Sequence, residues 1–446
     1  MKKRIDTKDV SVGMYIAELD RPWLETPFLF QGFEILTESD VKELQQFCKY
    51  VYIDVERSMP LPVEPTINTI KAKQKIPKKK TPAPIAFELP KLRVLETEPV
   101  YEPDAKKIEF EILKTSAAPQ APQTYVDQTV LEEEIQIVRK TYDYAKETVQ
   151  TLWEDARHGR NIKLDSARKM VIDMAESAIR NPDALMCLAQ LKQKDHYTAE
   201  HSLRVTVLAL TFARHLGFDR VQMNLLGIGS LMHDVGKMKI PSEILLKPAE
   251  LTQKEASIME HHVPLGVKIL ESTDIPGESI EVARRHHERY NGTGYSSGLK
   301  GDAIGQFGMI GGITDFFDAL TSDRPYRSGQ PAHIILRDMY KARNKLFHGE
   351  MVEQFIQCLG VYPIGSVVEL NTGDIGVVTT NNRVLRLRPK VALVLNQDNQ
   401  PYTKLKIIDL VNDRTTSGSI YEISTVCEPE KYGINPIRYL PVAKTA

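Results

Sequence analysis

Histidine residues concentrate in one part of this 446-residue chain. Eight of the eleven histidines fall between His196 and His287, and an apolar run that contains Asp315 follows them. One pair, His233-Asp234, is adjacent in the sequence, although such a pair alone is common by chance. Imidazoles together with carboxylates are the donors that borderline divalent metal ions prefer. The gathered histidines, together with Asp234 and Asp315, therefore predict a metal centre.

The candidate ligands fall on several expected helices, a distribution that is typical of dinuclear centres inside helical bundles. A carboxylate such as Asp234 can bridge two metals through its two oxygens, and the metals then lie about 3.5–4 Å apart and activate a shared water. A single histidine on an apolar helix face is more often a core residue with satisfied hydrogen bonds. His196, His215 and His261 are interpreted in that way, because no motif includes them.

The elements that must position these residues are predicted to be helices throughout residues 126–360. Apolar residues recur there at helical spacing, and Asn-Pro or glycine residues interrupt the runs. The expected helices cover about 126–158, 165–179, 184–193, 201–216, 220–233, 252–270, 279–286, 307–320, 331–346 and 351–359.

The segments on either side of the helical part have a different composition. Residues 1–58 predict a small α/β domain with strands near 10–19, 28–36 and 50–54 and a helix after Thr37. Residues 59–125 are rich in proline and lysine and predict a linker. Residues 361–446 predict a β-rich extension with strands near 367–370, 375–379, 390–395 and 404–410. The predicted fold class is therefore mainly α, with a small N-terminal α/β domain and a small C-terminal β appendage.

Composition excludes several classes of function. The chain has 58 basic and 59 acidic residues, so its net charge of −1 favours neither a nucleic-acid polymer nor an anionic membrane as partner. Its four cysteines are widely separated and form no CxxC pair, which indicates reduced thiols. No run approaches the about 20 apolar residues of a membrane span, and the N-terminus has no apolar signal region. We expect a cytoplasmic protein.

Three stretches resemble a known family. His233-Asp-Val-Gly-Lys237 resembles the signature of the HD phosphohydrolase superfamily. His286-His-Glu-Arg-Tyr-Asn-Gly-Thr-Gly-Tyr295 and Asp315-Phe-Phe-Asp-Ala-Leu-Thr-Ser-Asp-Arg-Pro-Tyr-Arg327 resemble its HD-GYP subgroup, which comprises bacterial phosphodiesterases that hydrolyse cyclic di-GMP to pGpG and then GMP. The resemblance covers about 185–360. Residues 1–58 resemble a domain of unknown function found before many such domains, and the segment from Leu359 onward resembles the usual C-terminal extension of the subgroup.

The resemblance implies two divalent metal ions. One would be bound by His201, His233, Asp234 and Asp315, and the other by Asp234, His262, His286 and His287. His262 is preferred to His261 because its spacing matches the family. Some members bind a third metal through a glutamate four residues before the first histidine, and Tyr197 stands there in this chain. Iron or manganese would suit the donors best, with zinc, nickel and cobalt as alternatives.

The resemblance also implies the residues that act on the substrate. Asp234 and Lys237 would be catalytic, and Lys237, Tyr295, Arg324 and Arg327 would contact cyclic di-GMP. The chain departs from the family at two positions of the loop: Asn291 replaces an aspartate, and Ser296 replaces the proline of the Gly-Tyr-Pro triplet. The altered loop and the N-terminal domain are candidate surfaces for a protein partner. The chain is also a candidate to form a homodimer.

These observations predict a metal-dependent phosphodiesterase that hydrolyses cyclic di-GMP to pGpG, GMP or both. The alternative from another class is a catalytically weak receptor or scaffold that binds cyclic di-GMP in the same site. A third candidate is an HD hydrolase that acts on other nucleotides, which the stretches at 286–288 and 292–295 disfavour.

Overall fold

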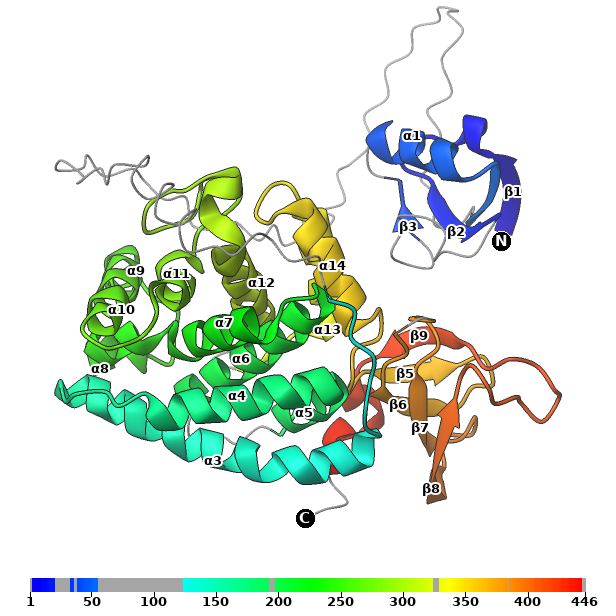
Figure 1. Cartoon of the computed structure of the whole chain (residues 1–446). Coiled ribbons are helices and arrows are strands. Elements are labelled where there is room, and N and C mark those ends of the chain that lie inside the picture. The colour runs from blue at the N-terminus through cyan, green and yellow to red at the C-terminus, as the bar shows by residue number, and fades with distance from the viewer. Residues whose placement is uncertain are drawn as a thin grey trace, which may run out of the picture. The chain divides into compact units, whose positions relative to one another are not determined.

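The computed structural model describes residues 2–20, 33–35, 38–54, 123–191, 197–323, 329–383 and 385–442. Contacts divide the chain into two compact units, and their described parts lie before residue 55 and after residue 122 (Figure 1). The predicted linker at 59–125 lies outside the described residues except for its last three. Among the described residues, no helix is both long and apolar enough to cross a bilayer.

The N-terminal unit is the predicted small α/β domain. Its four-stranded antiparallel sheet has the order β1-β4-β2-β3, and α1 packs beside it. The elements are β1 (Lys2–Asp6), β2 (Tyr15–Leu19), β3 (Phe33–Glu34), α1 (Glu38–Phe47) and β4 (Tyr50–Asp54). The sequence analysis missed β1. This strand lies at the edge of the sheet and pairs with β4 alone, and edge strands carry charged residues that hide their apolar pattern.

The second unit begins with the helical part, and the predicted fold class is confirmed there. The helix α6 lies at its centre, in contact with α7 and α12, while α3 and α4 run alongside one another on one side (Figure 1). The helices are α3 (Leu131–His158), α4 (Asp165–Arg180), α5 (Pro182–Ala189), α6 (Tyr197–His215), α7 (Arg220–Met232), η3 (Val235–Lys239), α8 (Ser242–Leu245), α9 (Gln253–Glu260), α10 (His262–Glu271), α11 (Gly277–Arg285), η4 (Gly301–Ile304), α12 (Gly305–Thr321), α13 (Ala332–Lys341) and α14 (Gly349–Leu359).

Three predicted helices were wrong in extent, and the one expected from 126 begins only at Leu131. The expected helix at 252–270 is divided into α9 and α10, which meet at His261. Pro264 is the third residue of α10, where a missing backbone N–H costs no helical hydrogen bond, so a new helix can begin there but the old one cannot continue through it. The expected helix at 331–346 ends at Lys341, because Asn344 adopts the left-handed conformation with φ of 59°.

The C-terminal part is a five-stranded antiparallel sheet of order β8-β7-β6-β5-β9. Its strands are β5 (Val367–Leu370), β6 (Ile375–Thr380), β7 (Lys390–Leu395), β8 (Pro401–Asp409) and β9 (Ile423–Cys427). Successive residues of β5 face opposite sides: Val367 joins the core of the helical part, whereas Val368 joins a separate core of the sheet. The sheet and helices therefore share one continuous core. The edge strand β9 was missed, because three of its five residues are not buried.

Candidate metal centre

The seven predicted ligands come from the ends of helices and from one helix interior. His201 lies in the second turn of α6, His262 begins α10, and Asp315 lies within α12. His233 and Asp234 form the junction between α7 and η3. His286 follows the last residue of α11, and His287 comes next. All except His287 are less than a tenth exposed, so five helical segments bring these polar groups into the interior.

Two glycines allow these segments to approach closely. A Cβ atom on Gly236 would lie 1.9 Å from the carbonyl oxygen of His262, and one on Gly312 would lie 2.8 Å from that of His286. Both distances are too short for a side chain to fit without movement of the backbone. Gly236 thus permits η3 to pack against α10, and Gly312 permits α12 to pack against the end of α11.

The ligands form two groups, each with donor atoms within 4.8 Å of one another. The first contains His201, His233 and Asp315. The second contains Asp234, His262, His286 and His287. Either group could hold a divalent metal ion, since each combines imidazole nitrogens with a carboxylate.

Asp234 faces both groups. Its Oδ2 atom lies 3.3 Å from Nε2 of His233 and 3.6 Å from Nε2 of His201. Its Oδ1 atom lies 3.3 Å from Nε2 of His262 and 3.8 Å from Nε2 of His286. One oxygen is therefore directed at each group, as a bridging carboxylate requires.

Asp315 also lies between the groups. Its Oδ1 atom is 3.1 Å from Nε2 of His201 and 3.8 Å from Nε2 of His233. Its Oδ2 atom is 4.0 Å from Nδ1 of His287. The sequence analysis assigned this residue to one metal only, and its second oxygen is close to a ligand of the other.

Backbone carbonyls fix the orientation of three imidazoles. Nδ1 of His233 donates to the carbonyl of Ser230 at 2.7 Å, and Nδ1 of His262 donates to that of Met259 at 2.8 Å. Nδ1 of His286 donates to the carbonyl of Ala283 at 3.0 Å. Because a carbonyl only accepts, the proton resides on Nδ1, and the lone pair of Nε2 is left to face the centre.

The protonation states also suit a metal. Burial lowers the pKa of His262 to about 4 and that of His286 to about 3, and it lowers the pKa of His287 well below its usual value. These rings are therefore neutral donors at pH 7. Burial by itself would raise the pKa of Asp234, but Lys237 and His233 beside it hold that pKa well below its usual value. The carboxylate is thus ionised.

Two buried atoms of the centre have no hydrogen bond among the described residues: Nε2 of His233 and Oδ1 of Asp234. A buried polar atom without a partner normally costs about 1–3 kcal/mol. Nε2 of His233 lies beside Oδ2 of Asp234, within the first group. The unpaired Oδ1 atom of Asp234 is directed at His262, within the second group. A metal ion in each group would satisfy both atoms, so the residues present fit two metals.

The predicted substrate residues are distributed differently. Lys237 pairs with Oδ2 of Asp234 and is partly exposed, so its ammonium lies at the rim of the centre. The Tyr295 ring stacks on His287, with centroids 4.5 Å apart and planes 24° apart. Arg324 and Arg327 lie outside the described residues. Tyr295 and Lys237 are thus the predicted contacts that the structure places beside the ligands.

The sequence analysis missed the residues that support the ligands. Nδ1 of His201 donates to Oδ2 of Asp318 at 2.7 Å, and Arg204 donates to both oxygens of Asp318 at 2.8 and 3.1 Å. Asp318 therefore turns Nε2 of His201 toward Asp315. Helical spacing was the available signal: Asp318 is three residues after Asp315, and Arg204 three after His201, so each pair shares a helix face.

Glu288 is a second supporting residue that was missed. It is buried, and its two carboxylate oxygens accept hydrogen bonds from the backbone N–H groups of Ser297 and Leu299, at 2.7 and 2.9 Å. These bonds attach the end of the glycine-rich loop to the segment that carries His287. The peptide bond between Tyr295 and Ser296 is cis.

Three family models match the chain. One described as an HD domain matches residues 183–350, which include all seven candidate ligands. A domain of unknown function (DUF3391) matches residues 2–167, well beyond the predicted domain boundary at 58. A KOW domain associated with the HD domain matches residues 367–431.

Relatives among curated proteins match this chain over different lengths. A cyclic di-GMP phosphodiesterase of Pseudomonas aeruginosa is 30% identical over 413 residues, which cover 92% of this chain and 89% of that protein. A cyclic di-GMP phosphodiesterase of Thermotoga maritima is 37% identical over 166 residues, covering 37% of this chain and 45% of that protein. A 3′3′-cGAMP-specific phosphodiesterase of Vibrio cholerae is 33% identical over 225 residues, covering 49% of each.

Proposed function

This chain belongs to the HD-domain family of its Pseudomonas aeruginosa relative, and we propose that it is a metal-dependent phosphodiesterase that hydrolyses cyclic di-GMP. The observation that carries the proposal is the position of Asp234. One of its oxygens faces His201 and His233, and the other faces His262 and His286. A carboxylate whose two oxygens face two groups of imidazoles is an arrangement suited to two cations.

The proposed metal ligands are those of the two groups. His201, His233, Asp234 and Asp315 would hold one ion, and Asp234, His262, His286 and His287 the other. When bound, the two ions would polarise the phosphodiester and activate a water for attack on phosphorus. Imidazole and carboxylate donors suit iron or manganese, and also zinc, nickel and cobalt. Metal analysis of protein purified without oxygen, assayed beside turnover, would identify the ion.

Two further residues have proposed roles in handling the substrate. The ammonium of Lys237 lies beside Asp234 at the rim, where it can donate to a phosphate oxygen and offset the charge that develops during the reaction. The Tyr295 ring lies over His287, next to the ligands, where its edge can contact a nucleotide. Arg324 and Arg327 remain predicted substrate contacts.

Cyclic di-GMP is preferred as the substrate because the relative named for it matches nearly the whole chain. The named cGAMP-specific relative matches only half of this chain. Hydrolysis of cyclic di-GMP, 3′3′-cGAMP and pGpG should therefore be followed side by side by chromatography. We expect cyclic di-GMP to be consumed fastest, with pGpG or GMP as product. Faster hydrolysis of 3′3′-cGAMP would contradict the substrate assignment.

A matched pair of adjacent histidines tests the site itself. His262 is 1% exposed within the second group, whereas His261 is exposed and its Nδ1 donates to the carbonyl of Ser257. We expect His262→Ala to lose one metal per chain and nearly all turnover, and His261→Ala to retain both. Equal effects of the two substitutions would refute the ligand assignment.

The receptor alternative makes a different prediction for the same assay. A receptor would bind cyclic di-GMP and leave it intact when loaded with metal. The seven donors that lie together at the centre favour the enzyme, since binding alone does not require them. A cytoplasmic location, a homodimer and a partner at the loop or the N-terminal domain remain predictions from the sequence.

A further inference from the structure

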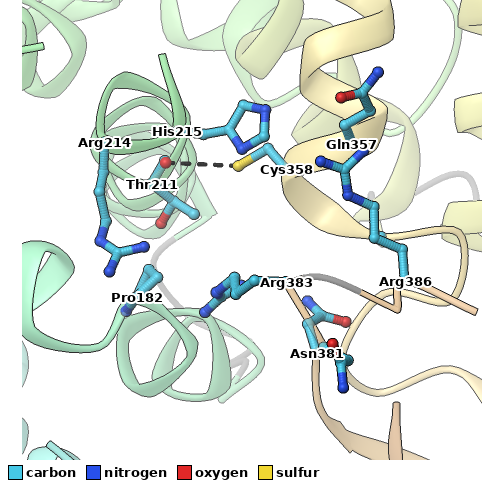
Figure 2. A pocket seen from close by; sticks show the side chains of 11 residues that line it. Pro182, Thr211, Arg214, His215, Gln357, Cys358, Asn381, Arg383 and Arg386 are labelled. Carbon is cyan, nitrogen blue, oxygen red and sulfur yellow. Dashed lines mark hydrogen bonds between the residues drawn. The ribbon is translucent and has the colours of Figure 1, made fainter. Parts of the chain in front are cut away.

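A polar cavity lies where the helical part meets the C-terminal sheet, at the opposite end of α6 from His201. Figure 2 shows side chains from α6, from the end of α14 and from the segment 381–386, which connects β6 to β7, converging on it. Three arginines line the cavity: Arg214 from α6, and Arg383 and Arg386 from the connecting segment. No candidate metal ligand lines it. This cavity is therefore separate from the proposed active site.

The start of the connecting segment, at 381–383, is bonded to the helices. The backbone N–H of Asn381 donates to Oδ2 of Asp183 at 3.0 Å, and its side-chain amide donates to the carbonyl of Leu359, also at 3.0 Å. The Arg383 guanidinium donates to Oδ1 of the same aspartate. Asp183 is 2% exposed, so these bonds are shielded from water. Asn381 and the Arg383 guanidinium are thus held against the helices.

Positive charge exceeds negative charge around this cavity. Arg214 pairs with Asp127 at 2.7 Å, and Arg383 pairs with Asp183 and, at 3.5 Å, with Asp127. No carboxylate among the described residues pairs with Arg386, whose pKa is lowered by burial. Three guanidinium groups therefore face two carboxylates.

His215 lies in the same region of excess positive charge. It lines the cavity, and its Nε2 atom is 3.0 Å from Oε1 of Gln354. Burial lowers its pKa, and the positive charges of Arg386, Arg383 and Arg214 lower it further. The electrostatic potential inside the cavity therefore favours an anion.

The buried hydroxyl of Thr211 lacks a hydrogen-bond partner, which a ligand in the cavity would supply. Thr211 is 3% exposed and lines the cavity, and its Oγ1 atom has no hydrogen bond among the described residues. A buried threonine in a helix usually donates to the carbonyl four residues earlier. The unpaired Thr211 hydroxyl is thus a donor available to a ligand in the cavity.

The size of the cavity limits the ligand. Its volume is about 50 Å³, and a water needs about 10–15 Å³ by the same measure. The cavity therefore accommodates a few oxygen-sized atoms, as in one tetrahedral oxyanion, but not a whole nucleotide. Arginine donors match phosphate oxygens in geometry as well as in charge.

We propose that this cavity binds one phosphate group, held by Arg386, Arg383 and the Thr211 hydroxyl. The source is inorganic phosphate or the 5′-phosphate of a nucleotide whose remainder stays in solvent. Because the donors come from α6 and from the 381–386 segment, the bound phosphate fastens the C-terminal sheet to the helix that begins beside His201.

Equilibrium dialysis of the metal-loaded full-length protein against radiolabelled inorganic phosphate tests the proposal. Phosphate at the metals is common to all variants, so the cavity is measured as the difference between them. We expect the wild-type protein to bind one more phosphate per chain than Arg386→Gln. Thr211→Val should lower the affinity for that phosphate by about 3–10-fold, which corresponds to the loss of one hydrogen bond. The matched control is Arg414→Gln, because Arg414 is an exposed arginine of the same sheet domain.

Retention of the additional phosphate in Arg414→Gln and its loss in Arg386→Gln would support the proposal. Equal phosphate binding by the wild-type protein and Arg386→Gln would overturn it. Circular dichroism and an unchanged rate of cyclic di-GMP hydrolysis establish that Arg386→Gln is folded. Competition by GMP but not by guanosine identifies a nucleotide phosphate as the source, whereas competition by neither identifies inorganic phosphate.

Discussion

The two ends of α6 hold opposite kinds of polar cluster. Near its start, His201 belongs to a centre in which ring N–H groups are bonded outward, to Asp318 and to backbone carbonyls. At its end, Arg214 and His215 line a cavity whose guanidinium groups place N–H donors around the space. The first arrangement suits cations, and the second suits an anion.

Histidines at the two ends of this helix differ accordingly. Burial would lower the pKa of His201, but its hydrogen bonds to Asp315 and Asp318 raise that pKa overall. Burial lowers the pKa of His215, and three nearby arginines lower it further. The same residue type on one helix therefore acquires opposite properties from the charges that other segments place beside it. The pKa of a histidine on α6 therefore depends on the residues that pack against it more than on its place in the helix.

The largest expected effect is that of Asp234→Asn. The substitution removes the charge of the carboxylate whose two oxygens face the two groups, so the binding of both metals should be weakened together. Turnover of cyclic di-GMP should fall by more than the about 10²–10³-fold that removal of one transition-state contact costs. Metal content and turnover would be measured on the same preparation. Asp302→Asn, at an exposed carboxylate of η4, is the control and should retain both.

Gly236→Ala should have the next largest effect, on stability. The added methyl would meet the His262 carbonyl at 1.9 Å, which forces η3 away from α10. We expect a loss of about 3 kcal/mol in the free energy of unfolding, at the upper end for overpacking, measured by denaturant titration. Gly277→Ala is the control, because a methyl there meets nothing within 4 Å. A similar loss in both variants would show that the close approach at Gly236 is unimportant.

Asp318→Asn should weaken the cation site without removing a ligand. The amide can no longer hold the His201 ring as a charged acceptor, and it also leaves Arg204 without a carboxylate partner at that position. Loss of such a supporting hydrogen bond typically costs 10–100-fold, or about 1.4–2.7 kcal/mol, in metal affinity. Competition with a chelator would measure the affinity of each variant. Unchanged affinity would mean that Asp318 supports only the fold.

The smallest effect concerns the anion end of α6. Because the pKa of His215 is lower in the folded protein than in the unfolded chain, the unfolded chain binds the proton first as pH falls. His215 therefore reduces stability as pH falls through the unfolded value of about 6.5. As pH falls from 8 to 5.5, the wild-type protein should therefore lose more unfolding free energy than His215→Gln does. A difference that does not change with pH would contradict the positive potential assigned to the cavity.

Much of the cation end was predictable from the sequence. Its donors occur in contiguous motifs, and the helices that carry them have regular apolar spacing, so helix identity and the candidate ligands could be predicted together. The supporting pair Asp318 and Arg204 was not predicted, because each residue gains its role from a contact between α6 and α12. The break at His261 was missed because Pro264 fits a first helical turn and the apolar spacing continues across it.

The anion end was not predictable, because its parts are distant in sequence. Arg214 and Arg386 are 172 positions apart and belong to no shared motif. Each alone reads as a solvated basic residue. Only the packing of the β6–β7 connection against α5 and α14, through Asp183 and Leu359, brings their charges together.

The sequence by itself thus determined which donors the protein owns: the seven His and Asp side chains, their place in helices, and the family they resemble. Tertiary structure alone decided what those donors face. Which imidazole nitrogen is bonded outward, which oxygen of Asp234 meets which histidines, and which arginines surround Thr211 all depend on contacts between separate elements. The physical reason is that residue type fixes the chemistry of a group, whereas burial, direction and neighbouring charge, which set its pKa and its ligand, arise only when the chain packs.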